Sequence, residues 1–269
     1  MNRVICLIAF LIVALTVQRA LVTPSLYRIP ENKVVVEWAA VTFICNPTGN
    51  PTPNITWLKD DRTIGRGENL TFVANRNSSG EYWCIADSGS NATGNVSAKL
   101  NVLFAPSFTI VPSDQTVMEQ ERVTFTCSAT GNPVPNITWI KDGQTVDVGD
   151  VLSFKATRDH SGIYRCLVDN GVEKNIETSF SFNVQYLPNL DSKPSNQTVM
   201  EGTKATFHCN ATGNPAPSVR WIKDGNTVGQ KDLLSFVTKR NDSGKYWCLA
   251  ENGLNSTVTA IAYLDVQCC

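Results

Sequence analysis

The chain has 269 residues, of which 42% are hydrophobic and 17% are charged, and its formal net charge is −1. The apolar content is sufficient for buried cores. No run or stripe rich in lysine and arginine is present, so nucleic acid is not an expected partner.

The first twenty residues, 1–20, have the pattern of a secretory signal peptide. An apolar run from Val4 to Leu15 follows a basic residue and is too short to span a bilayer. Cleavage is expected near Ala20. The rest of the chain is therefore predicted to be secreted or extracellular, in a compartment where disulfides persist, and association with a cell surface stays open.

A unit of 82 residues is written three times in what remains. Each copy has two cysteines 39 residues apart, a tryptophan twelve residues after the first cysteine, and a tyrosine two residues before the second. We expect three domains, 24–105, 106–188 and 189–267, each containing one disulfide. The predicted disulfides are Cys45–Cys84, Cys127–Cys166 and Cys209–Cys248, and the predicted core residues are Trp57, Trp139, Trp221, Tyr82, Tyr164 and Tyr246.

Hydrophobic residues alternate with polar ones around these landmarks, which predicts strands with one buried face and an all-β fold. In the first repeat the alternation runs through Val41, Phe43 and Cys45, and the same pattern recurs in the other two. Lys-Asp-Gly at 141–143 and 223–225 predicts turns, and Asn-Gly at 170–171 and 252–253 predicts tight hairpins. The first repeat has other residues at these places, so its hairpins are expected to differ.

Short apolar connectors that contain Pro106 and Pro188 join the repeats without a flexible Gly/Ser stretch. Such links favour an extended, semi-rigid rod of three sandwiches.

The paired cysteines, the tryptophan and the tyrosine are hallmarks of the immunoglobulin sandwich. Each repeat also has Gly-Asn-Pro-X-Pro just before its tryptophan, beginning at Gly49, Gly131 and Gly213. The chain thus closely resembles the I-set of the immunoglobulin superfamily, as found in IgLON-type neural adhesion proteins and hemicentin-like arrays. The family's acidic residue six before the second cysteine, which holds the loop before the tyrosine, is present only as Asp242. Ser78 and His160 replace it elsewhere, so that bond is expected only in the third repeat.

The sequence gives little support for a metal-binding or catalytic role of the cysteines and histidines. Zinc-binding cysteines stand two to four residues apart, unlike these pairs. Asp159, His160 and Ser161 are neighbours in one short loop and cannot line up as a catalytic triad. The other histidine, His208, is expected to face solvent. No metal, cofactor or enzyme activity is predicted.

Asn-X-Ser/Thr sequons are dense, and strand parity places them on the solvent side, so we expect most to carry glycans. Five lie in the first repeat, one in the second and four in the third. The second repeat has ten acidic residues against six basic ones and a single sequon, and we hypothesise that it offers unshielded contact surface. The ten sequons are Asn54, Asn69, Asn77, Asn91, Asn95, Asn136, Asn196, Asn210, Asn241 and Asn255.

The last two residues, Cys268 and Cys269, leave three readings open. They can link two chains into a disulfide-bonded dimer, pair with each other under strain, or mark a truncated or alternatively spliced end. Prenylation is discounted, because it is a cytosolic modification. No membrane span or lipid-anchor signal is expected from these residues.

The resemblance implies an extracellular or cell-surface protein that mediates cell adhesion or cell–cell recognition through homophilic or heterophilic protein contacts. Two alternatives stay open. One is a soluble secreted binder, such as an immune recognition factor or a decoy, and the other is a truncated ectodomain of a longer receptor. Fold alone does not assign the ligand.

Overall fold

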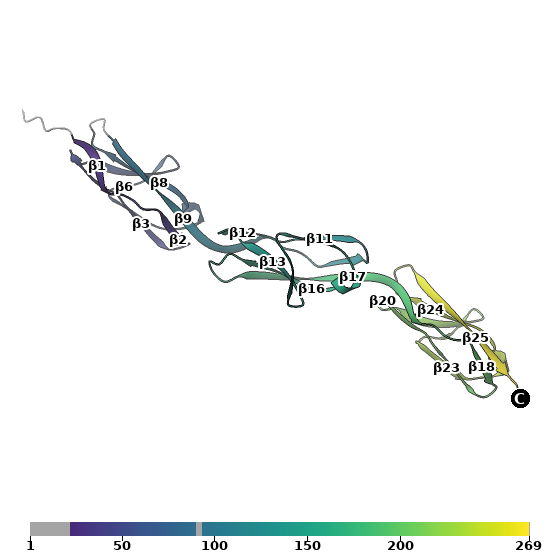
Figure 1. Cartoon of the computed structure of the whole chain (residues 1–269). Helices are drawn as coiled ribbons and strands as arrows, with labels where there is room; N and C mark the ends of the chain where they lie inside the picture. Colours follow the sequence, from purple (N-terminus) through teal and green to yellow (C-terminus); the bar gives the residue numbers. More distant parts are fainter. Residues whose placement is uncertain (1–21, 90–92, 269) are drawn as a thin grey trace, which may run out of the picture. The chain divides into compact units, whose positions relative to one another are not determined.

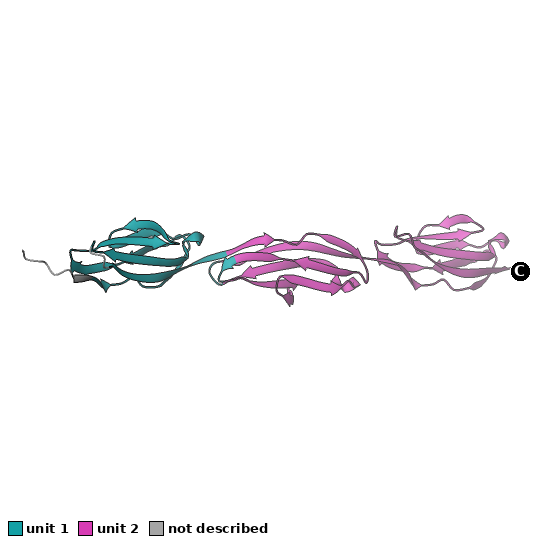
Figure 2. Cartoon of the chain, turned by 90° about the horizontal axis from the view of Figure 1, so that it is seen from above, with its two compact units in different colours: residues 1–105, 131–133, 171–173 teal, residues 106–130, 134–170, 174–269 magenta. Residues whose placement is uncertain are grey.

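The computed structural model describes residues 22–89 and 93–268 (Figure 1). The chain divides into two compact units, which Figure 2 shows in different colours. Unit 1 comprises residues 1–105, 131–133 and 171–173, and unit 2 comprises residues 106–130, 134–170 and 174–269. The predicted signal peptide lies outside the described residues.

Unit 1 contains one β-sandwich, coloured teal in Figure 2. One of its layers has the strand order β2-β9-β8-β5-β6, with β2 parallel to β9. The other layer is made of the pairs β1-β4 and β3-β7. The elements are β1 (Val22–Arg28), β2 (Lys33–Val36), β3 (Ala40–Ile44), β4 (Asn46–Asn50), β5 (Asn54–Lys59), β6 (Arg62–Arg66), β7 (Asn69–Val73), the 3-10 helix η1 (Arg76–Ser78), β8 (Gly80–Asp87) and β9 (Thr93–Ile110).

Unit 2 contains two further sandwiches of the same topology, with main layers β10-β17-β16-β13-β14 and β18-β25-β24-β21-β22. The elements of the first are β10 (Gln115–Met118), β11 (Arg122–Thr126), β12 (Ser128–Asn132), β13 (Asn136–Lys141), β14 (Gln144–Val148), β15 (Val151–Lys155), η2 (Arg158–His160), β16 (Gly162–Asp169) and β17 (Ile176–Ser192). The elements of the second are β18 (Gln197–Met200), β19 (Lys204–His208), β20 (Asn210–Asn214), β21 (Ser218–Lys223), β22 (Asn226–Gly229), β23 (Leu233–Val237), η3 (Arg240–Asp242), β24 (Gly244–Glu251) and β25 (Thr257–Gln267).

Three separate hydrophobic cores confirm the predicted all-β fold of three tandem sandwiches. Each core lies between the two layers and is built from the alternate residues that the period-two pattern marked as inward. In the first core these include Val41, Phe43 and Leu100, all nearly inaccessible to solvent. The domain boundaries themselves stay a prediction, because β9 and β17 run through residues 105 and 188 as continuous strands.

The tight hairpins occur at the Lys-Asp-Gly turns, where two residues link β13 to β14 and β21 to β22. Asp142 and Gly143 both have positive φ, as the common two-residue hairpin turn requires. The first repeat makes the same turn with Asp60 and Asp61, at φ 50° and 60°, so the expectation that its hairpin would differ was wrong. Aspartate tolerates this left-handed conformation better than most residues with a side chain.

The prediction of tight hairpins at the Asn-Gly pairs was wrong. The strands that flank Asn252 end at Glu251 and resume at Thr257, so a five-residue loop joins them. Asn252 is buried, and its side-chain amide donates to the carbonyls of Tyr186 and Pro215 at 2.9 and 3.0 Å. The side chain is thus engaged in a tertiary contact. The other pair, at 170–171, also lies in a longer loop, because its flanking strands end at Asp169 and resume at Ile176.

Candidate interaction surface

The three predicted cysteine pairs are bonded, with S–S distances of 1.90, 1.95 and 1.87 Å. Each bond joins the two layers of one sandwich, and Trp57, Trp139 and Trp221 are fully buried in the cores that hold the bonds. Each indole N–H donates to a backbone carbonyl, of Gly67, Gly149 and Lys231, at 2.8 to 2.9 Å. A buried indole has a polar group that must be paired, and these bonds pair it.

The tyrosine before each second cysteine forms a corner with the loop that precedes it. Tyr82 donates its hydroxyl hydrogen to Ser78 O at 2.8 Å, and Tyr164 and Tyr246 make the same bond to residues 160 and 242 at 3.0 and 2.9 Å. Burial, with a smaller contribution from nearby aspartates, raises the pKa of all three phenols to about 12. These groups are therefore structural donors and not acid–base catalysts near neutral pH.

The loop bond expected only at Asp242 is present in all three repeats. The backbone N–H of Lys239 donates to Asp242 Oδ2 at 2.7 Å. The corresponding N–H groups of residues 75 and 157 donate to Ser78 Oγ and His160 Nδ1, each at 3.0 Å. Serine and histidine supply an acceptor from the same position, so the expectation for the first two repeats was wrong. His160 sits in the 3-10 helix η2 and also packs on Phe154, with ring centroids 4.3 Å apart.

Every sequon asparagine in the described part of the chain has an exposed side chain, while Asn91 lies outside the described residues. Asn54, Asn95 and Asn136 lie on the outer face of the main sheet layers, in β5, β9 and β13. The others lie on the second layer, in short connecting segments or in loops. Their accessibility is compatible with glycosylation, which stays a prediction.

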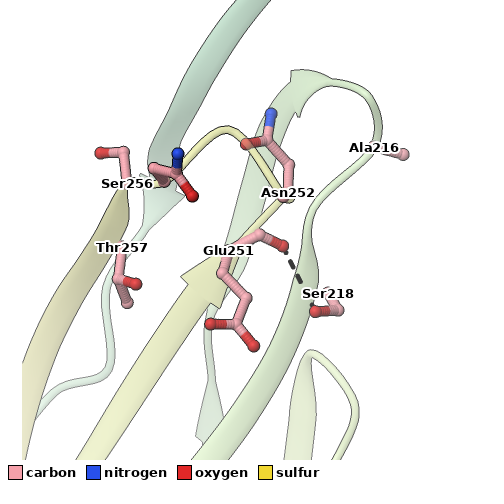
Figure 3. Close-up of a pocket in the computed structure, with 8 residues that line it drawn as sticks. Ala216, Ser218, Glu251, Asn252, Ser256 and Thr257 are labelled. Carbon is pink, nitrogen blue, oxygen red and sulfur yellow. Dashed lines mark hydrogen bonds between the residues drawn. The ribbon is translucent and has the colours of Figure 1, made fainter.

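A polar pocket of about 430 Å³ lies at one end of the last sandwich, between β21, β24 and the loop before β25, as Figure 3 shows. Glu251 is its one ionisable residue, and Ser218 Oγ donates to Glu251 O at 3.3 Å. Asn252 Oδ1 is buried there without a hydrogen-bond partner. The lining contains no histidine, lysine, arginine or cysteine, and the cation that pairs with the carboxylate, Arg220 at 3.6 Å, lies outside it, so the lining supplies no acid–base couple.

A cluster of large apolar side chains lies on the outer face of the last sheet, on three adjacent strands. Trp247 in β24 pairs with Ile261 in β25 and with Ile222 in β21. Trp247, Ile261 and Tyr263 remain 38%, 39% and 49% exposed. Leu249 joins them, and Lys245 Nζ lies 5.5 Å from the centre of the Tyr263 ring. We call these five apolar residues, Ile222, Trp247, Leu249, Ile261 and Tyr263, the apolar face.

Sequence reasoning concentrated on inward residues and missed the apolar face. The signal was available, because its residues alternate with the core residues on the same strands. An outward position normally takes a polar residue in a sheet with one solvated face, so a large apolar residue there is informative.

Two further predicted features can be placed. Cys268 is exposed and unpaired, whereas Cys269 lies outside the described residues. His208 is exposed, and the described residues contain no cluster of three or more histidine, cysteine or acidic side chains placed to hold a metal. Within 22–89 and 93–268, no helix has the length and apolarity needed to cross a membrane.

Curated relatives share much of this chain but are far longer. Human Roundabout homolog 2 is 30% identical over 90% of this chain and 20% of its own length. The mouse Peroxidasin homolog is 31% identical over 90% of this chain and 18% of its own length. The chain therefore spans about a fifth of the relatives that it matches.

Solved structures with the same fold include tandem immunoglobulin domains. The three-domain titin fragment I67–I69, as an E-to-A variant, has a TM-score of 0.68, with 24% identity over 92% of this chain and all of that chain. A chain from the complex of Dpr2 Ig1-Ig2 with DIP-Theta Ig1-Ig3 also has a TM-score of 0.68, with 19% identity over 91% of this chain and all of that chain.

The family model for the immunoglobulin domain matches this chain three times, at residues 23–88, 105–170 and 188–252. Each match contains one disulfide, one buried tryptophan and one tyrosine corner. The chain belongs to the immunoglobulin superfamily and contains three immunoglobulin domains in tandem.

Proposed function

We propose that this chain is an extracellular or cell-surface protein that recognises other proteins, in cell adhesion or cell–cell recognition, and that binding is its activity. The apolar face is the observation that carries the proposal. Contiguous exposed apolar side chains, in a protein whose cores are filled, are typical of protein-binding surfaces. Tryptophan and tyrosine, both present here, are enriched where binding energy is concentrated.

Two further observations support the proposal. The three disulfides and the many exposed sequons fit a protein made in the secretory pathway. The Dpr2 and DIP-Theta structure is a complex of two proteins built from immunoglobulin domains, so chains with this fold can bind protein partners. We propose that the sequon asparagines carry glycans and thereby restrict binding to the surfaces they leave uncovered.

The proposal can be tested with the purified glycosylated chain, coupled to fluorescent beads. We expect the beads to bind a protease-sensitive component on cells, to clump with one another, or both. Beads that carry the reduced and alkylated chain are the control, because they display the same sequence without the native fold. If the native beads show neither behaviour on a broad panel of cell types, the proposed function is wrong.

A further inference from the structure

The middle strand of the apolar face has a symmetric arrangement of side chains. Its outward residues are, in order, Lys245, Trp247, Leu249 and Glu251, while the residues between them are buried. The row therefore has a base at one end, an acid at the other and two apolar residues in the centre. Position 248 is its midpoint.

We propose that a second copy of this chain binds the apolar face, with a two-fold axis at the level of position 248. The two β24 strands then cross antiparallel, face to face. This inference rests on the proposed function and names the partner.

The charges favour this arrangement, because a two-fold axis brings each residue opposite the one equally far from the midpoint. Lys245 of each copy comes opposite Glu251 of the other, and Trp247 comes opposite Leu249. Each charge lies three residues from the midpoint, or about 10 Å at about 3.3 Å per residue. The result is an apolar centre with complementary charges at the rim, the usual anatomy of a protein interface.

The neighbouring strands add two isoleucines to the apolar centre, and they also bring Arg220 opposite Ile222 of the second copy, where Arg220 has Glu251 of its own sheet as an ion-pair partner. Ile222 and Ile261 lie on either side of Trp247 in the sheet. Arg220 Nη2 lies 3.6 Å from Glu251 Oε2, and both side chains are well exposed, so the carboxylate remains accessible to a second cation.

The corresponding row in the first repeat lacks this self-complementarity. In β8 the outward residues are Glu81, Trp83, Ile85 and Asp87. The same two-fold arrangement would bring the acid at one end of the row opposite the acid at the other end of the second copy. Opposed like charges at an interface are unfavourable.

The corresponding row in the second repeat also lacks self-complementarity. In β16 the row is Ile163, Arg165, Leu167 and Asp169. Two-fold pairing would bring Arg165 opposite Leu167 and Ile163 opposite Asp169. Arg165 has an ion pair with Glu177 at 3.4 Å within its own sheet, but it would lose water without gaining an opposite charge from the second copy, which is unfavourable. Only the third repeat combines an apolar centre with opposite charges at the two ends.

The positions of the sequons also distinguish the third repeat from the first two. In the first repeat Asn54 and Asn95 lie on the outer face, paired with Asp87 and Ile85. In the second repeat Asn136 lies there, paired with Asp169. The third repeat has no sequon on these strands, since Ser218 and Thr259 take the corresponding positions.

Sequon Asn255 lies in the loop beyond Glu251, and both residues line the pocket at that end of the sandwich. The described sequons of the third repeat therefore lie off the three strands that form the apolar face, whereas each of the first two repeats has at least one sequon on the equivalent strands.

The test is sedimentation velocity of the glycosylated chain over a range of micromolar concentrations, in a Cys268→Ser, Cys269→Ser background that excludes intermolecular disulfides. We expect a reversible dimer. Lys245→Glu and Glu251→Lys should each raise the dimer dissociation constant at least about tenfold, because each opposes like charges. The double variant should restore most of the affinity, since the pairs are re-formed with reversed sign.

Two more variants locate the contact. Trp247→Arg introduces the residue that the second repeat tolerates as Arg165, and should weaken the dimer about thirtyfold or more. Glu81→Lys changes the equivalent charge in the first repeat and should leave the dimer unchanged. Thermal unfolding of each variant checks that it is folded.

A chain that stays monomeric at all these concentrations would overturn the inference. So would a dimer in which the double variant is no tighter than the single ones. Either result leaves the proposed function standing if beads still bind a protein on cells. Loss of both bead binding and bead clumping would instead reject the proposed function.

Discussion

Trp38 occupies, at φ 72°, the turn position that Gly202 occupies at φ 79° in the third repeat. In the first repeat, Ala39 N–H donates to Val36 O at 3.1 Å, and in the third Thr203 N–H donates to Met200 O at the same distance. The turn is thus the same in both. A left-handed backbone is open to glycine but strained for a residue with a Cβ, and the Trp38 side chain is 72% exposed, so packing compensates little.

Trp38→Gly should stabilise the first sandwich. The strain relieved is about 1–2 kcal/mol, and the added flexibility of glycine in the unfolded chain offsets about 0.5–1 kcal/mol of it, which leaves a gain of up to about 1 kcal/mol. Denaturant unfolding of the full chain, compared between wild type and variant, would measure the gain. Trp38→Ala is the control, because alanine keeps the Cβ and should bring no gain. Equal gains from both variants would contradict the explanation.

Stability should fall as pH rises from about 10 toward 12. The folded-state pKa of Tyr82, Tyr164 and Tyr246 is raised to about 12 from an ordinary value of 10.0. Above pH 10 the unfolded chain releases these protons while the folded chain retains them, so the stabilisation is complete below pH 10 and is lost on the way to 12. Melting temperature against pH would show this decline. Tyr82→Phe should lower the melting temperature of the first sandwich at neutral pH and flatten its alkaline decline, whereas an unchanged slope would contradict this.

Asp242→Ala should destabilise the third sandwich more than Ser78→Ala destabilises the first. The aspartate accepts a charge-assisted bond from Lys239 N–H at 2.7 Å, and the serine accepts a neutral one from Asn75 N–H at 3.0 Å. We expect losses of about 1.5–3 and about 0.5–1.5 kcal/mol in urea unfolding. Asp242→Ser, which keeps a neutral acceptor, should fall between wild type and Asp242→Ala. Asp242 and Ser78 are each the middle residue of a sequon, so the three substitutions leave the sequons at Asn241 and Asn77 intact.

Removing one disulfide, by Cys127→Ala with Cys166→Ala, should cost the second sandwich about 4 kcal/mol in the chain-entropy estimate for a loop of this length. That is a large part of the stability of a small domain. Guanidinium unfolding, followed by the fluorescence of the buried Trp139, would report it. A loss below about 1 kcal/mol would show that the apolar packing around Trp139 is sufficient without the bond.

The main strands and their inward residues could be predicted from the sequence, because a strand with one buried face has hydrophobic residues at every second position. The turns at Lys-Asp-Gly could also be predicted, since aspartate and glycine tolerate the positive φ that a two-residue hairpin turn requires. The loop at the second Asn-Gly pair could not be predicted in this way, because Asn252 donates to Tyr186 O and Pro215 O, which are 66 and 37 residues away in the sequence. The loop bonds of Ser78 and His160 were missed because the expectation was limited to an acidic residue, whereas a serine hydroxyl or a histidine ring nitrogen at the same position also accepts the bond.

The amino-acid sequence by itself determined the threefold repeat, the cysteine partners and the face that each strand buries, since these depend on local spacing and alternation. Only the tertiary structure decided which outward residues meet on one surface. Trp247, Ile261 and Ile222 come from three strands, and cross-strand register, which no single segment encodes, places them side by side.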